Sequence, residues 1–173
     1  MRFKLTILLF VITISNMYSQ EKELEFLQNN ISKFDFVNEL SYAAGYSLVY
    51  SYTYSIENGR LTQVTTYVKT NESLIQSADL DDLIEVEKVV EDVNQEYIKL
   101  IFKKGAVSWD NGGVQEKQEE IFIHLCKKSY QPGNMDSMEC TETLYQLSDE
   151  FPKKIIKAFE QYAYSTKQNH QNN

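Results

Sequence analysis

The chain has 173 residues, with 25 acidic and 17 basic side chains and a formal net charge of −8. This length suits one domain with a single hydrophobic core. Because an acidic protein repels phosphate groups, the charge argues against nucleic acid as a partner and against adhesion to an anionic membrane.

Residues 1–20 have the pattern of a secretory signal peptide. Arg2 and Lys4 precede an apolar stretch, Leu5–Ile14, which is followed by small or polar residues. The stretch is half of the roughly 20 residues that a spanning helix needs, which favours a cleaved signal over an N-terminal membrane anchor. We expect cleavage on one side or the other of Gln20. The mature protein is then exported, to the periplasm or the medium, and has no integral membrane segment.

A helix is expected at about residues 21–33. Apolar side chains recur there with helical spacing at Leu24, Leu27, Ile31 and Phe34. Charged and amide residues lie between them, which is typical of a helix with one buried face. Such a helix would cover a sheet or form a mobile arm.

The clearest strand prediction covers residues 46–56, where Tyr, Leu and Ile side chains alternate with mostly small polar ones, Ser and Thr, and one Val. An Asn-Gly pair at 58–59 is the preferred two-residue hairpin turn, and a second strand follows over 61–70. The turn sets the register of this hairpin and places Tyr50 opposite Tyr67.

Three tyrosines of the first strand, Tyr50, Tyr52 and Tyr54, are candidate binding residues. Exposed aromatic side chains bind sugars and protein partners. The alternative is that these side chains are buried beneath a helix. Leu48 and Ile56 share their face of the strand, which favours burial.

Four carboxylates at Asp79, Asp81, Asp82 and Glu85 raise the question of a calcium site. No glycine lies among them and their spacing does not match an EF-hand, so we favour a solvated acidic turn. Residues 83–90 fit the periods of both a helix and a strand. Their β-branched content favours a strand.

Further strands are expected over 96–103, 105–109, 119–127 and 138–147, followed by an amphipathic helix over 149–164 and a disordered polar tail over 165–173. Trp109, the only tryptophan, ends one of these strands before a loop over 110–118. It could bind a ligand at the edge of the loop. We favour a role in filling the core.

The two cysteines lie in strands 119–127 and 138–147, which flank a Pro-Gly turn at 131–134. A symmetric hairpin about this turn places Cys126 opposite Cys140. In an exported protein, two facing cysteines favour a disulfide.

The same hairpin places His124 opposite Glu142, on the face that carries both cysteines. Besides a disulfide beside a His–Glu pair, two alternatives use these residues: a zinc site built from Cys126, Cys140, His124 and Glu142, and a Cys–His nucleophile. Flat strands spread zinc ligands too widely, and a disulfide would remove the nucleophile. We therefore favour the disulfide and expect no metal.

Short connections between about seven strands predict an α+β fold. It comprises a mostly antiparallel sheet or partly open barrel, with an N-terminal helix and a C-terminal capping helix. Seven antiparallel strands followed by a helix resemble the order in pleckstrin-homology-like folds. Ala78-Asp79-Leu80-Asp81, the two Cys-bearing strands and Ile155-Ile156-Lys157-Ala158-Phe159 resemble a group of small exported bacterial proteins of unknown function. The resemblance covers roughly residues 45–163 and implies a fold but no activity.

The sequence contains no Gly-rich phosphate loop, G-x-S-x-G elbow or H-E-x-x-H motif. We therefore expect a binding or interaction module without catalytic activity or cofactor, which binds an unidentified protein or glycan ligand. One alternative is a small secreted hydrolase using His124 with Glu142. The other is a structural component of a cell-envelope assembly.

Overall fold

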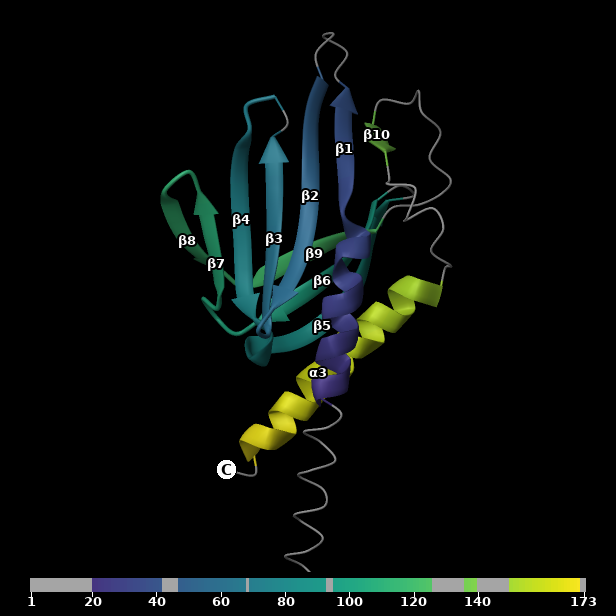
Figure 1. Ribbon diagram of the computed structural model, residues 1–173, viewed down its shortest axis with the longest axis vertical. Helices are drawn as coiled ribbons and strands as arrows, with labels where there is room; N and C mark the ends of the chain where they lie inside the picture. The colour runs from purple at the N-terminus through teal and green to yellow at the C-terminus, as the bar shows by residue number, and fades with distance from the viewer. Residues whose placement is uncertain are drawn as a thin grey trace, which may run out of the picture.

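The computed structural model describes residues 20–41, 47–67, 69–92, 95–125, 136–139 and 150–171. Within these residues the protein has the predicted α+β architecture, with an N-terminal helix, antiparallel sheets that do not close into a barrel, and a C-terminal helix (Figure 1). Residues 1–19, almost all of the predicted signal peptide, lie outside the described part. Among the described residues, no helix combines the length and apolar character that crossing a bilayer requires.

Two sheets form the centre of the fold. The larger contains β1 (Phe36–Ser41), β2 (Ser47–Glu57), β3 (Arg60–Tyr67), β4 (Glu72–Asp79), β7 (Val107–Asn111), β8 (Val114–Gln118) and β10 (Asp136–Glu139). The smaller contains β5 (Leu83–Asp92), β6 (Gln95–Phe102) and β9 (Glu120–Leu125). In the described part of the chain, the seven strands of the larger sheet are ordered β10-β1-β2-β3-β4-β7-β8 and the three of the smaller β5-β6-β9. The registered pairs are antiparallel, as predicted.

The β2–β3 hairpin forms in the predicted register, with Tyr50 opposite Tyr67. Asn58 and Gly59 both have positive φ angles, 50° and 77°, as a two-residue turn between twisted strands requires. Residues 83–90 are a strand, as predicted. The sequence analysis missed β1, β4 and β8. No buried side chain lies in β8, so this strand carries no alternating pattern to detect.

In the predicted hairpin between strands 119–127 and 138–147, each residue pair includes a residue outside the described part, so this pairing stays a prediction. β9 pairs with β6 in the smaller sheet, and β10 pairs with β1 at the edge of the larger one. In the β6–β9 pairing, Ile121 and Ile123 face Leu100 and Ile98, and all four are fully buried. Cys126, Cys140 and Glu142 lie outside the described residues, so the disulfide stays a prediction.

The N-terminal helix belongs to the core and is not a mobile arm. Residues 20–30 are helical and continue into the 3₁₀ helix η1 (Ile31–Phe34), which contacts β2 and β9. Leu27, Ile31 and Phe34 are essentially inaccessible to solvent. The ring of Phe34 stacks on Phe151 of the C-terminal helix, with centroids 5.7 Å apart. The predicted helical period therefore marks the face that packs.

The C-terminal helix α3 (Glu150–Gln171) extends beyond its predicted end at residue 164. It packs on β5 and on the 3₁₀ helix η2 (Leu80–Asp82). The prediction of a disordered tail is wrong for residues 165–171, since Ser165 and Thr166 are buried. The Thr166 hydroxyl donates to the carbonyl of Tyr162 (3.1 Å), so it is satisfied by its own helix. The last turns of the helix are therefore buried although their sequence carries no apolar periodicity.

Candidate functional site

One row of side chains crosses the inner face of the larger sheet at the border between core and solvent. Strand register aligns Tyr54 of β2, Gln63 of β3, Gln76 of β4 and Trp109 of β7. Cross-strand neighbours share a face, so these four side chains project from the same side of the sheet. We call them the amide row.

Burial decreases along the strands from one side of this row to the other. On one side of the row, the inner face is covered by the core, and Ile56, Leu61 and Ala78 are each at most 6% exposed. On the other side, Tyr50 and Tyr67 are only half-buried, and their rings lie 4.7 Å apart. In Figure 1, β1 to β4 extend well beyond the smaller sheet. The predicted tyrosine strand is therefore buried at one end and accessible at the other.

Tyr54 joins the two sheets. Its side chain is 2% exposed, and its hydroxyl accepts from the backbone N–H of His124 (3.2 Å) and donates to the carbonyl of Phe122 (3.4 Å). Both partners belong to β9, which is an edge strand of the smaller sheet as far as the described residues show. Burial raises the pKa of Tyr54, so the hydroxyl remains protonated and able to donate.

An aromatic cluster formed by Tyr52, Tyr97, Phe122 and His124 lies beside this junction. The His124 ring is 4.9 Å from the ring of Tyr52 and 6.1 Å from that of Tyr97, which in turn meets Phe122 edge-on at 5.2 Å. All four side chains are half-buried. Burial, and then the neighbouring Tyr50 hydroxyl, raise the pKa of Tyr52. The cluster presents ring surface rather than charge.

Gln63 was not singled out by the sequence analysis. Its side chain is 3% exposed, and among the described residues its Oε1 has no hydrogen-bond partner. The adjacent Gln76 is satisfied, because its Nε2 donates to Oε1 of Gln118 (2.9 Å). A signal was present, since the Asn-Gly turn sets a register that places Gln63 opposite Tyr54 on the buried face.

Trp109 does not fill the core, contrary to the favoured sequence interpretation. It lies in the middle of β7, half-buried, with Gln76 and Glu116 as its cross-strand neighbours. Val107, two residues earlier, is fully buried and occupies the core position of this strand. Trp109 therefore remains available to contact a ligand from the amide row.

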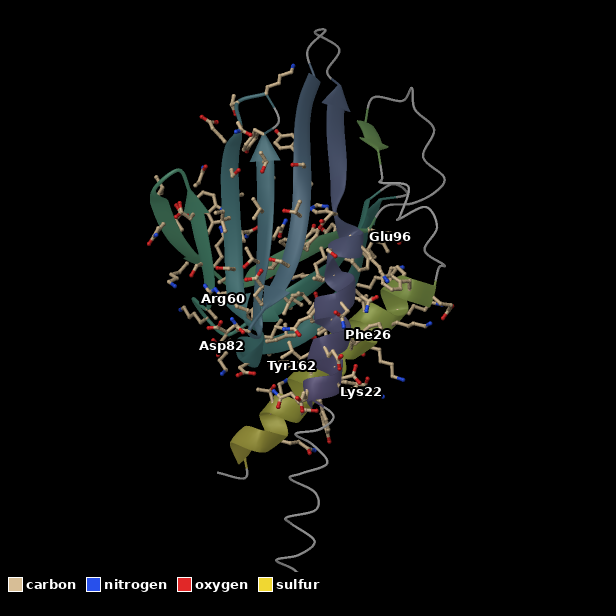
Figure 2. All side chains as sticks on the ribbon, viewed as in Figure 1. Lys22, Phe26, Arg60, Asp82, Glu96 and Tyr162 are labelled. Carbon is tan, nitrogen blue, oxygen red and sulfur yellow. The ribbon has the colours of Figure 1, made fainter. Side chains whose placement is uncertain are left out.

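The acidic segment makes separate contacts with separate partners. Asp79 pairs with Arg60 (3.1 Å), and the Tyr162 hydroxyl donates to Asp81 (2.8 Å). Asp82 pairs with Lys103 (2.9 Å). Figure 2 shows the labelled Arg60, Asp82 and Tyr162 around the lower end of the larger sheet.

Burial, and then the hydrogen bond to Asp81, raise the pKa of Tyr162 to about 12. Across the described ranges, no three His, Cys, Asp or Glu side chains gather as metal ligands would. These contacts tie η2 to the helix and the sheet around it, and they give the acidic segment a structural role.

Asp35 is expected to make stability depend on pH. Its Oδ1 accepts from the backbone N–H of Tyr54 (2.7 Å), but burial dominates and raises its pKa above the ordinary 3.8. The folded chain therefore holds this proton more tightly, and the contribution to stability is lost as the pH rises through the raised value. Asp35→Asn keeps an acceptor and cannot ionise. Urea denaturation should find it more stable relative to the wild type at pH 7 than at pH 3.5, and a pH-independent difference would contradict this.

Comparison with protein-family models, curated proteins and solved structures found no match to this chain. The chemistry of the inner face therefore has to be derived from its own residues.

Proposed function

We propose that the protein is an exported, non-catalytic binding module that holds its ligand against the inner face of the larger sheet. One observation carries this proposal. Along the same strands of the larger sheet, the inner face changes from fully buried apolar side chains to half-exposed aromatic rings and amides. Aromatic rings with neighbouring polar groups are what ligand-binding surfaces require, because rings supply contact area and polar groups supply orientation. The signal-peptide pattern over residues 1–20 supports export.

The surroundings of His124 favour binding over hydrolysis. Aromatic rings packed around an imidazole supply contact area for a ligand. Here the ring lies between Tyr52 and Tyr97, and the backbone N–H is held by Tyr54. These contacts fix His124 as one more planar side chain of the aromatic cluster.

Truncating Tyr52 is expected to release a bound ligand. We expect the mature chain purified from producing cells to retain an adduct in native mass spectrometry, and Tyr52→Ala to lose most of it. Removal of a central aromatic contact costs about 2 kcal/mol or more, which corresponds to roughly 30-fold in affinity.

Tyr164→Ala is the matched control, since Tyr164 is 64% exposed on α3 and lies away from the inner face. This control should keep the adduct. Turnover of ester, peptide or glycoside substrates that His124→Ala abolishes would contradict the proposal and support a hydrolase instead.

A further inference from the structure

We propose that the amide row is a subsite for a neutral carbohydrate, in which Gln63 accepts a hydrogen bond from a sugar hydroxyl and Trp109 supports a sugar ring. The inference rests on the proposed function, because it names the ligand class for the same inner face. Two independent features carry it: a buried oxygen that lacks a donor, and a half-exposed indole on the same row.

The oxygen of Gln63 requires a donor. Buried polar atoms in folded proteins are almost always hydrogen-bonded, because leaving one unpaired forfeits the bonds it made with water. Gln63 lies between Leu61 and Thr65 on the inner face of β3, and its Oε1 has no partner within the described chain. A Met or Leu at this position would pack without that penalty. A glutamine here is explained if a ligand hydroxyl completes its hydrogen bonds.

Trp109 supplies the other half of carbohydrate recognition. A pyranose ring presents C–H groups on its faces and hydroxyls around its edge, so it pairs with a flat aromatic surface flanked by amides. Trp109 is separated from Gln63 by Gln76, which is two strand spacings, or about 9 to 10 Å. That separation exceeds the width of one sugar ring. A chain of at least two linked rings lying across β3, β4 and β7 would engage both residues.

The charge of the surface indicates that the sugar is neutral. The four side chains of the amide row carry no charge, and the register of β3, β4, β7 and β8 places two charged residues on the same face, Glu116 opposite Trp109 and Glu72 opposite Tyr67. Both are acidic, and the whole chain carries a net charge of −8. Uronates, sulfated sugars and phosphates would be repelled.

The test uses the fluorescence of Trp109, which reports on this site alone because the chain has no other tryptophan. The mature protein is titrated with lactose, maltose, cellobiose and chitobiose, and with glucuronate as the anionic comparison. We expect a saturable change for at least one neutral disaccharide and none for glucuronate.

Gln63→Met should weaken this binding by about tenfold or more, the size expected when one hydrogen bond to the ligand is lost. It should also raise the thermal midpoint, because it removes an unpaired buried oxygen. Gln161→Met, at an exposed position of α3, should change neither quantity.

The absence of any saturable change up to tens of millimolar disaccharide would overturn the inference, as would a Gln63→Met variant that binds like the wild type. A Gln63→Met variant that is less stable than the wild type would also count against it. If the disaccharides fail while Tyr52→Ala still releases a retained adduct, the carbohydrate assignment falls and the proposed function stands. If both fail, both fall.

Discussion

Tyr54→Phe is expected to lower the free energy of unfolding by about 1 to 3 kcal/mol, because it removes the two part-buried hydrogen bonds that the hydroxyl makes with β9. Phe keeps the ring, so little packing is lost, and the effect isolates the hydroxyl that bridges His124 and Phe122. Urea denaturation followed by circular dichroism measures it. The linear extrapolation should return a lower midpoint with a similar slope.

The control for this hydroxyl is Tyr164→Phe, at the exposed tyrosine of α3. An exposed substitution of this kind is expected to change stability by less than about 0.5 kcal/mol. A Tyr54→Phe variant as stable as the control would show that the two sheets do not depend on this bridge. The result also bears on function, since the bridge positions the aromatic cluster next to β2.

Leu27→Ala is expected to cost about 2 to 5 kcal/mol, because it deletes buried methyl groups from a fully enclosed side chain and leaves a cavity. The residue lies in the N-terminal helix, so the experiment measures how much this helix contributes to the core. The thermal midpoint of a domain of this size should fall by roughly 4 to 20 °C, at about 2–4 °C per kcal/mol.

Gln28→Ala is the matched control, as its side chain is exposed on the same helix. Ala is also the better helix former, so this change should be nearly neutral. Equal stability of Leu27→Ala and Gln28→Ala would mean that the helix is dispensable, and would restore the mobile-arm alternative.

Local sequence signals account for much of this fold. The Asn-Gly pair dictates the β2–β3 turn, because both of its residues adopt positive φ angles that other residue types rarely tolerate. The alternation that precedes it then specifies which tyrosines share a face. The spacing of Leu27, Ile31 and Phe34 likewise identifies the buried side of the N-terminal helix.

Strand pairing between distant segments was beyond local signals. The local pattern around β9 indicated a turn after this strand and gave no indication of its pairing with β6, which lies well before it in the chain. Alternation within a strand reveals its buried face but says nothing about which strand lies beside it. The end of α3 was misjudged for a related reason. Its last turns are held by hydrogen bonds from Thr166 and Lys167, which leave no apolar period in the sequence.

The sequence by itself determined the local elements: the hairpin, the amphipathic N-terminal helix, the acidic turn and the α+β class. Each of these depends on backbone geometry or on periodicity within a short segment. Only the tertiary structure decided that Val107 rather than Trp109 fills the core, that Tyr54 bridges to β9, and that the Gln63 oxygen is buried without a donor. Those facts depend on which strands become neighbours, and burial of a side chain is a property of its neighbours rather than of its own position in the chain.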